Sequence, residues 1–94
     1  MANRFLHIGF RFVIEPDLEN LEKTFDNALD WYRYAPNCWV VWTSSSPEKW
    51  HSRLKKHLED DDIMLICELN VDKRSGWMPK KFWNFIKSHH VAEC

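Results

Sequence analysis

Four cations surround one tryptophan near the C-terminal end of the chain. The set is Lys73, Arg74, Trp77, Lys80 and Lys81. Lysine and arginine neutralise phosphates and an indole ring stacks on a base, so this combination is typical of a nucleic-acid-binding surface. The alternative is that Trp77 attaches a final helix to the core while the lysines are simply solvated.

A second charged set follows the first apolar stretch of the sequence. Its members, the candidate residues for binding a protein partner, are Glu19, Glu22, Asp26 and Asp30. On a helix they would form an acidic surface that suits a basic partner. The same residues are also consistent with the solvated face of an ordinary amphipathic helix.

Histidines, cysteines and glycines are not arranged for catalysis or metal binding. His51 and His57 are six residues apart on a predicted helix, about 600° of rotation, so they cannot bind one metal ion together. Cys38 and Cys67 lie in apolar runs without a neighbouring base, which indicates buried thiols and not nucleophiles. Two glycines are too few for a glycine-rich phosphate-binding loop. The sequence therefore predicts no bound metal and no cofactor.

The length of 94 residues predicts a single domain over 1–94, with 88–94 as a flexible tail. The 13 basic and 14 acidic residues nearly balance, so a polyanion site must be a local patch. The apolar runs are far shorter than the roughly 20 residues of a membrane span, and the N-terminus lacks a signal-peptide pattern. We therefore expect a cytoplasmic protein without a membrane partner.

The periodicity of apolar residues predicts four strands and three helices. Every second residue from Leu6 to Ile14 is a large apolar residue, which predicts a strand with one buried face, whereas apolar residues over 18–31 recur at helical spacing. The predicted strands are 5–14, 32–34, 38–43 and 63–69, and the predicted helices are 18–31, 47–59 and one that starts at Pro79. The order βαββαβ with an extra C-terminal helix predicts an α+β, ferredoxin-like fold, in which two helices cover one face of an antiparallel sheet.

Both faces of this predicted sheet carry apolar side chains. In an antiparallel sheet with one solvent-exposed face, apolar and polar residues alternate along each strand. Because both faces are apolar here, we expect another element or another copy to cover the second face. A homodimer, the C-terminal helix, or both together would provide the cover. The candidate residues for a dimer interface are Trp39, Trp42, Met64 and Ile66.

The second half of the chain resembles a known superfamily. An apolar strand over 37–43 and a helix precede the acidic residues 59–62, the strand Ile63-Met64-Leu65-Ile66, and Gly76-Trp77 before an aromatic helix. This order looks like the SinR-like branch of the superfamily that contains the small CRISPR-adaptation endoribonuclease and VapD-type toxins. The resemblance covers about Tyr32 to Lys87 and implies a ferredoxin-like subunit that forms a homodimer.

The resemblance also implies metal-dependent cleavage of phosphodiesters. Nuclease members carry an aspartate at the end of the first strand, where paired copies across the dimer hold a divalent metal. Here residues 4–14 contain no acid, and the matching position holds Phe10 or Arg11. Glu15 and Asp17 are the nearest substitutes, although a turn and a helix N-cap explain both without chemistry.

We therefore expect a non-catalytic, homodimeric binding or regulatory module with a protein partner of unknown identity. Such a small domain would act as an adaptor or inhibitor, for instance a mobile-element or phage protein that acts on a nucleic-acid-processing complex. One alternative is a metal-dependent endonuclease for RNA or DNA that uses Glu15 or Asp17. The other is a domain that binds nucleic acid directly.

Overall fold

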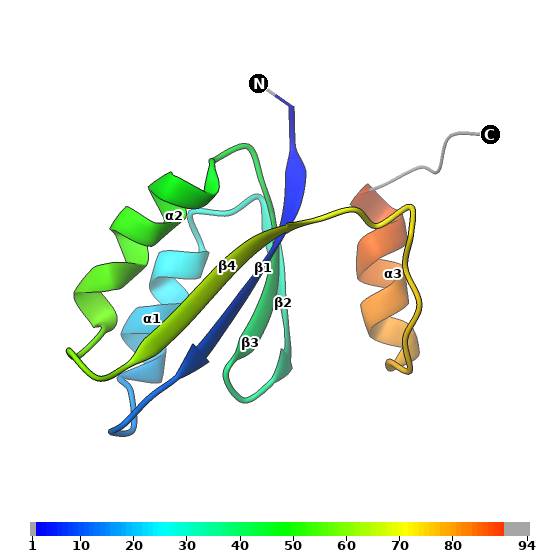
Figure 1. The fold of residues 1–94 in the computed structure, drawn as a ribbon. Coiled ribbons are helices and arrows are strands. Elements are labelled where there is room, and N and C mark those ends of the chain that lie inside the picture. The colour runs from blue at the N-terminus through cyan, green and yellow to red at the C-terminus, as the bar shows by residue number, and fades with distance from the viewer. Residues whose placement is uncertain (1, 90–94) are drawn as a thin grey trace.

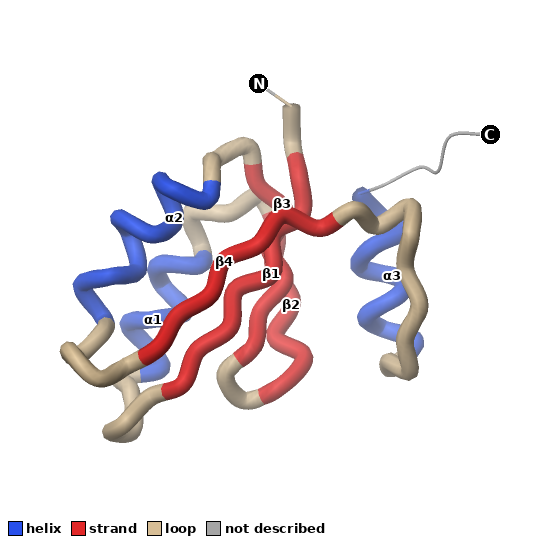
Figure 2. Tube along the Cα trace, viewed as in Figure 1, coloured by secondary structure: helices blue, strands red, loops and turns tan. Residues whose placement is uncertain are grey.

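The computed structural model describes residues 2–89, which form an α+β fold around one antiparallel sheet (Figure 1, Figure 2). The strands are β1 (Arg4–Arg11), β2 (Asp30–Ala35), β3 (Cys38–Thr43) and β4 (Ile63–Leu69). The helices are α1 (Leu18–Phe25), α2 (Pro47–Leu54), the short 3-10 helix η1 (Lys55–His57) and α3 (Lys80–His89). The strand order is β2-β3-β1-β4, as in a ferredoxin-like fold, which confirms the predicted fold class.

Helices α1 and α2 cover one face of the sheet, and α3 lies on the opposite side (Figure 1). The core beneath α1 and α2 is aromatic, with Phe25 stacked on Trp39 at a centroid distance of 4.7 Å. Its fully buried side chains are Leu6, Ile8, Leu21, Phe25, Trp39, Val41, Trp50 and Leu54. Alternation along β1 and β3 places Leu6, Ile8, Trp39 and Val41 on one face of the sheet, where the helix residues pack on them.

A second, smaller core lies between the sheet and α3. Its buried side chains are Phe5, Val40, Val71, Phe82, Phe85 and Ile86. At the end of α3, the His89 ring stacks on Trp42 at 5.4 Å, and His89 Nε2 lies 2.7 Å from Asp30 Oδ2. The C-terminal helix therefore covers part of the second sheet face, whereas Ile63 and Leu65 of β4 remain 52% and 60% exposed there.

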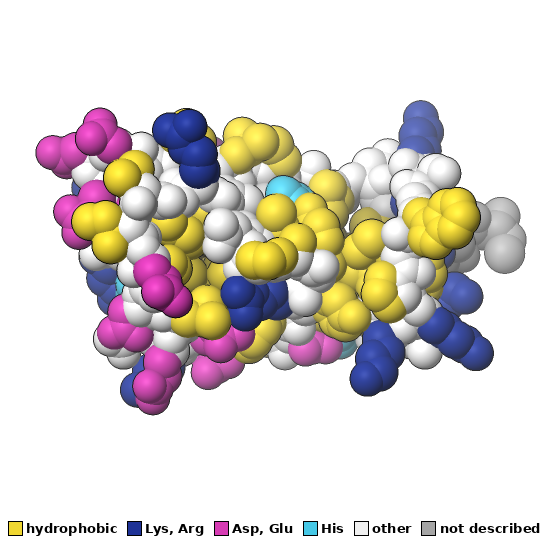
Figure 3. All heavy atoms as spheres, turned by 90° about the horizontal axis from the view of Figure 1, so that it is seen from below, with side chains coloured by type: hydrophobic (Ala, Val, Ile, Leu, Met, Phe, Trp, Pro, Cys, Tyr) yellow, Lys and Arg dark blue, Asp and Glu magenta, His cyan; other side chains and the backbone are white. Residues whose placement is uncertain are grey.

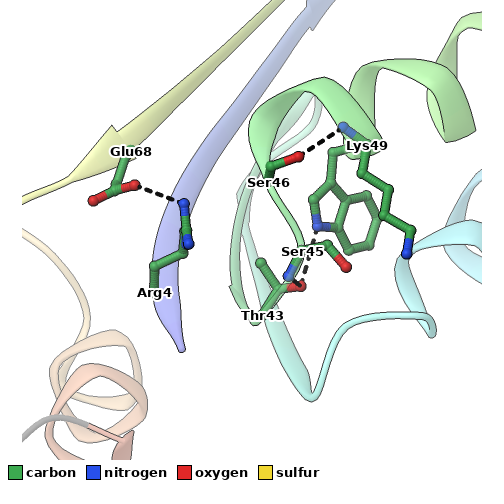
Figure 4. A network of polar contacts seen from close by, with 7 residues as sticks. Arg4, Thr43, Ser45, Ser46, Lys49 and Glu68 are labelled. Atoms are coloured by element: carbon green, nitrogen blue, oxygen red, sulfur yellow. Dashed lines mark hydrogen bonds and ion pairs between the residues drawn. The ribbon is translucent and has the colours of Figure 1, made fainter. Parts of the chain in front are cut away.

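Helix α2 begins with the N-cap and the proline that the sequence predicts. Ser46 accepts a hydrogen bond from the Lys49 backbone N–H at 3.2 Å, and Pro47 occupies the first helical turn (Figure 4). The Trp50 indole donates to Thr43 Oγ1 at 3.2 Å, which fixes the helix against β3. Strand β4 has the predicted bounds.

The predicted bounds of the first strand and first helix are too long. Helix α1 ends at Phe25 and not near residue 31, because the chain then turns and the Leu29 N–H donates to the Trp42 carbonyl at 2.9 Å, next to β3. Strand β1 ends at Arg11, and beyond it the Val13 N–H donates to the Asp62 carboxylate at 2.8 Å. Of the predicted tail 88–94, residues 88 and 89 belong to α3, and 90–94 lie outside the described residues.

Candidate nucleic-acid interface

The predicted nucleic-acid-binding residues lie together at the α3 end of the molecule. Lys73, Arg74 and Trp77 belong to the loop between β4 and α3, and Lys80 and Lys81 begin α3. We call these five residues the basic face. The segment 73–89 contains five Lys or Arg side chains and no Asp or Glu. In Figure 3 dark blue cationic side chains gather around α3, while magenta acidic side chains gather at the opposite end of the molecule.

Trp77 is the most exposed large apolar side chain of the described residues, at 101%. The structural alternative, in which Trp77 attaches the final helix to the core, is therefore wrong. Met78, Phe82, Phe85 and Ile86 perform that role instead. Tryptophan normally removes most of its ring from water. The Trp77 ring is thus free to stack on a ligand.

Arg74 is held in place at the centre of the basic face. One of its guanidinium nitrogens donates to the Val71 carbonyl at 2.8 Å, and the guanidinium lies 5.9 Å from the centroid of the Trp83 ring. Trp83 is half-buried and packs edge-to-face on Phe82. Both contacts orient the cation before any ligand arrives, which lowers the entropic cost of binding.

The structure adds three residues that sequence reasoning missed. Lys87, Asn84 and Trp83 line a shallow groove of about 410 Å³ together with Arg74 and Lys80. The signal for them is the helical spacing of Lys80, Asn84 and Lys87, which places them on one face of α3. The groove extends the cationic surface along the helix.

The four acidic candidates divide into two groups. Glu19 lies in an exposed ion pair with Lys23 at 3.9 Å, and Glu22 is half-buried beside it on α1. Asp26 accepts from the Trp31 indole at 3.1 Å, and Asp30 contacts His89. Asp26 and Asp30 therefore stabilise the fold, and Glu19 remains as an exposed acid that this set offers to a partner.

The candidate dimer residues lie mostly inside the protomer. Trp39 has no exposed surface, and Trp42 packs on Phe5 at 4.6 Å beneath α3. Met64 and Ile66 pack partly against the core beneath α1 and α2. Trp39 is therefore unable to contact a second copy, because the strand alternation turns it toward α1.

Glu15 and Asp17 line a groove of about 720 Å³ beside α1 and η1. Both carboxylate oxygens of Asp17 already accept hydrogen bonds within the protein, one from the Asn20 backbone N–H at 3.2 Å and one from the Asn20 side-chain amide at 2.7 Å. It acts as the N-cap of α1. Within residues 2–89, no three His, Cys, Asp or Glu side chains are close enough together to hold a metal ion.

Other polar groups of this groove also serve the loops around it. The Asp62 carboxylate accepts from the Val13 and Glu59 backbone N–H groups, each at 2.8 Å, and these hydrogen bonds lower its pKa. His57 Nε2 lies 2.7 Å from Thr24 Oγ1, which joins η1 to α1. Asp17, Asp62 and His57, which line the groove, thus hold the surrounding loops and helices together.

Both described cysteines are free thiols. Cys38 is half-buried as part of β3, but Cys67 is exposed, so the prediction of two buried thiols is wrong for Cys67. The reason is that β4 is an edge strand, and Cys67 lies on the part of the sheet that α3 does not cover.

Comparison with protein-family models, curated proteins and solved structures gave no match for this chain. None of the helices among the described residues is long and apolar enough to cross a membrane. The fold and the site together define the class as a ferredoxin-like α+β domain that presents a cationic, tryptophan-bearing surface on its additional helix and the loop before it.

Proposed function

We propose that this protein is a non-catalytic binding module that holds single-stranded nucleic acid on the basic face. The observation that carries the proposal is the complete exposure of Trp77 among four cations. A ring in that position stacks on a base, and the lysines and arginine neutralise the adjoining phosphates. Single strands are the better ligand because their bases are accessible to the ring, whereas a duplex hides them.

The distribution of charge determines at which end of the molecule a nucleic acid strand binds. Residues 15–30 contain six acids and one lysine, and residues 59–62 are all acidic, so the end opposite α3 repels phosphates. A strand therefore approaches the α3 end. The acidic Glu19 side of the molecule stays available to a basic protein, which suits an adaptor or inhibitor within a nucleic-acid-processing complex.

The proposed module is a homodimer formed through β4. This strand is an edge of the sheet, it carries the exposed Ile63 and Leu65, and Glu68 is its only charged residue. Edge strands of monomers are usually protected by lysine, proline or a covering element. Pairing with a second copy would satisfy the free backbone groups and cover the two apolar side chains.

Fluorescence anisotropy with a labelled oligonucleotide of about 15 nucleotides tests the proposed function. The quadruple variant Lys73→Ala, Arg74→Ala, Lys80→Ala, Lys81→Ala should lose most of the affinity, and the slope of log affinity against log salt should shrink by up to about three. The matched control removes four exposed lysines elsewhere: Lys23, Lys49, Lys55 and Lys56. Equal losses in the two variants would refute the assignment to the basic face.

A further inference from the structure

A cavity of about 350 Å³ lies between the second sheet face and the loop and helix that carry the basic face. Its walls are largely apolar, with contributions from Val40 of β3, Leu69 of β4, and Phe82 and Ile86 of α3. A volume of this size is within the range of small-molecule sites. Because α3 covers only part of the sheet, the cavity is open to solvent.

The sheet end of the cavity holds two hydrogen-bonded polar side chains, His7 of β1 and Tyr34 of β2, with His7 Nε2 2.6 Å from Tyr34 Oη. Burial lowers the pKa of His7, and burial followed by the interaction with Cys38 raises the pKa of Tyr34 to about 12. Both groups are therefore uncharged at neutral pH. They offer hydrogen bonds to a neutral polar ligand and no attraction for a phosphate.

The opposite rim of the same cavity belongs to the basic face. Lys73, Arg74 and Ser75 line it, and Trp83 forms part of both this cavity and the cationic groove along α3. One opening thus combines apolar walls, an uncharged hydrogen-bonding end and a cationic rim. These are the three chemical parts of a nucleotide site: base, base edge and phosphate.

We propose that this cavity receives the base of one unstacked nucleotide, with the base edge at His7 and Tyr34 and the adjoining phosphate at Lys73 and Arg74. The inference rests on the proposed function and adds a site for a single base to it. A purely apolar ligand would offer no hydrogen bond to His7 or Tyr34, the two polar side chains that lie at this end of the cavity. Inorganic phosphate would contact the rim and leave the apolar walls unused.

Titration with the four nucleoside 5′-monophosphates, each followed by NMR chemical shifts, tests the cavity without any nucleic acid strand. We expect at least one of them to bind, and Tyr34→Phe to weaken that binding roughly three- to tenfold, because one hydrogen bond is lost. Tyr32→Phe is the matched control, since Tyr32 lies on the same strand, is not among the residues that line the cavity, and packs its ring on Phe82 and Phe85.

Two results would overturn the cavity assignment: no nucleoside monophosphate binds at millimolar concentration, or Tyr34→Phe and Tyr32→Phe bind equally well. Its failure is separable from failure of the proposed function. If an oligonucleotide binds but no monophosphate does, the basic face is retained as the binding surface and the base site is refuted. If a monophosphate binds but no oligonucleotide does, the base site is retained and the proposed function is refuted.

Discussion

Trp77 and Trp83 lie six residues apart at the same end of the molecule, in opposite environments. Trp83 packs on Phe82 and lies near Arg74, whereas Trp77 is fully exposed. Local sequence does not distinguish them, because both follow Gly76 in an aromatic, cationic stretch. The contacts of α3 with the sheet decide which ring is buried, and these contacts depend on residues distant in the sequence. Four of the cations were predictable from sequence, whereas Lys87 and the choice between an exposed and a packed Trp77 were not.

Substitution of Trp77 by Ala separates ligand binding from stability. We expect the affinity for a single-stranded oligonucleotide to fall about fivefold to a hundredfold, because one stacked base is lost. The free energy of unfolding should stay within about 0.5 kcal/mol of the parent, since the ring is exposed. Thermal and urea unfolding alongside anisotropy measure both quantities. A destabilised Trp77→Ala protein would show that the ring packs on the fold.

Two buried tryptophans differ in the hydrogen bond of the indole. Trp50 donates to Thr43, whereas the Trp39 indole N–H is buried without a protein partner. The substitutions Trp50→Phe and Trp39→Phe remove similar volumes, so they differ mainly in this bond. We expect Trp50→Phe to lower the free energy of unfolding by about 1 kcal/mol more than Trp39→Phe. Urea unfolding of the two variants measures the difference, and equal losses would contradict it.

At the scale of elements, pairing with β3 ends the helical pattern of α1 earlier than the sequence predicts. Leu29 and Tyr32 continue the helical spacing of α1, yet the Leu29 N–H bonds to β3 and Tyr32 belongs to β2. Strand β4 matches its prediction, because the acidic turn before it and the polar turn after it are local signals. The order of elements was therefore predictable, whereas the boundary between α1 and β2 required the sheet.

The burial of His57, in η1, makes stability depend on pH. Burial, with a smaller contribution from Lys56, lowers the pKa of His57 below 6.5, and Asp17 opposes this only partly. The unfolded chain therefore binds a proton that the folded chain resists, so stability falls as pH decreases below about 6.5. We expect His57→Gln to weaken this fall between about pH 7.5 and pH 5.5.

Urea unfolding at both pH values measures the effect. His51→Gln is the matched control, because His51 is an exposed histidine on α2 and makes no hydrogen bond to α1 among those described. An equal pH dependence in His57→Gln and the parent would show that His57 does not cause the loss of stability at low pH.

At the scale of the whole molecule, two exposed features lie in different places: the basic face on α3 and the loop before it, and the apolar side chains Ile63 and Leu65 on the edge strand β4. A dimer through β4 would keep both copies of the basic face accessible, which gives the assembly two binding sites for one strand. Two linked sites raise the overall affinity without any new contact. The proposed dimer and the proposed binding function therefore support each other.

Leu65→Lys tests the proposed dimer. We expect it to raise the dissociation constant of the dimer at least about tenfold, because a charge would be buried at the interface. Leu29→Lys is the matched control, since Leu29 is 64% exposed and precedes β2, at the other edge of the sheet. Light-scattering mass over a dilution series measures the change. A monomeric parent protein, or equal effects of the two variants, would contradict dimerisation through β4.

The most direct test of the proposed function is the affinity of the parent protein for a single-stranded oligonucleotide and for its duplex, measured as salt rises from about 50 mM to 200 mM. We predict tighter binding of the single strand, with an affinity that falls steeply as salt increases. Absence of binding at the lowest salt, or an affinity that salt does not change, would contradict the role of the basic face.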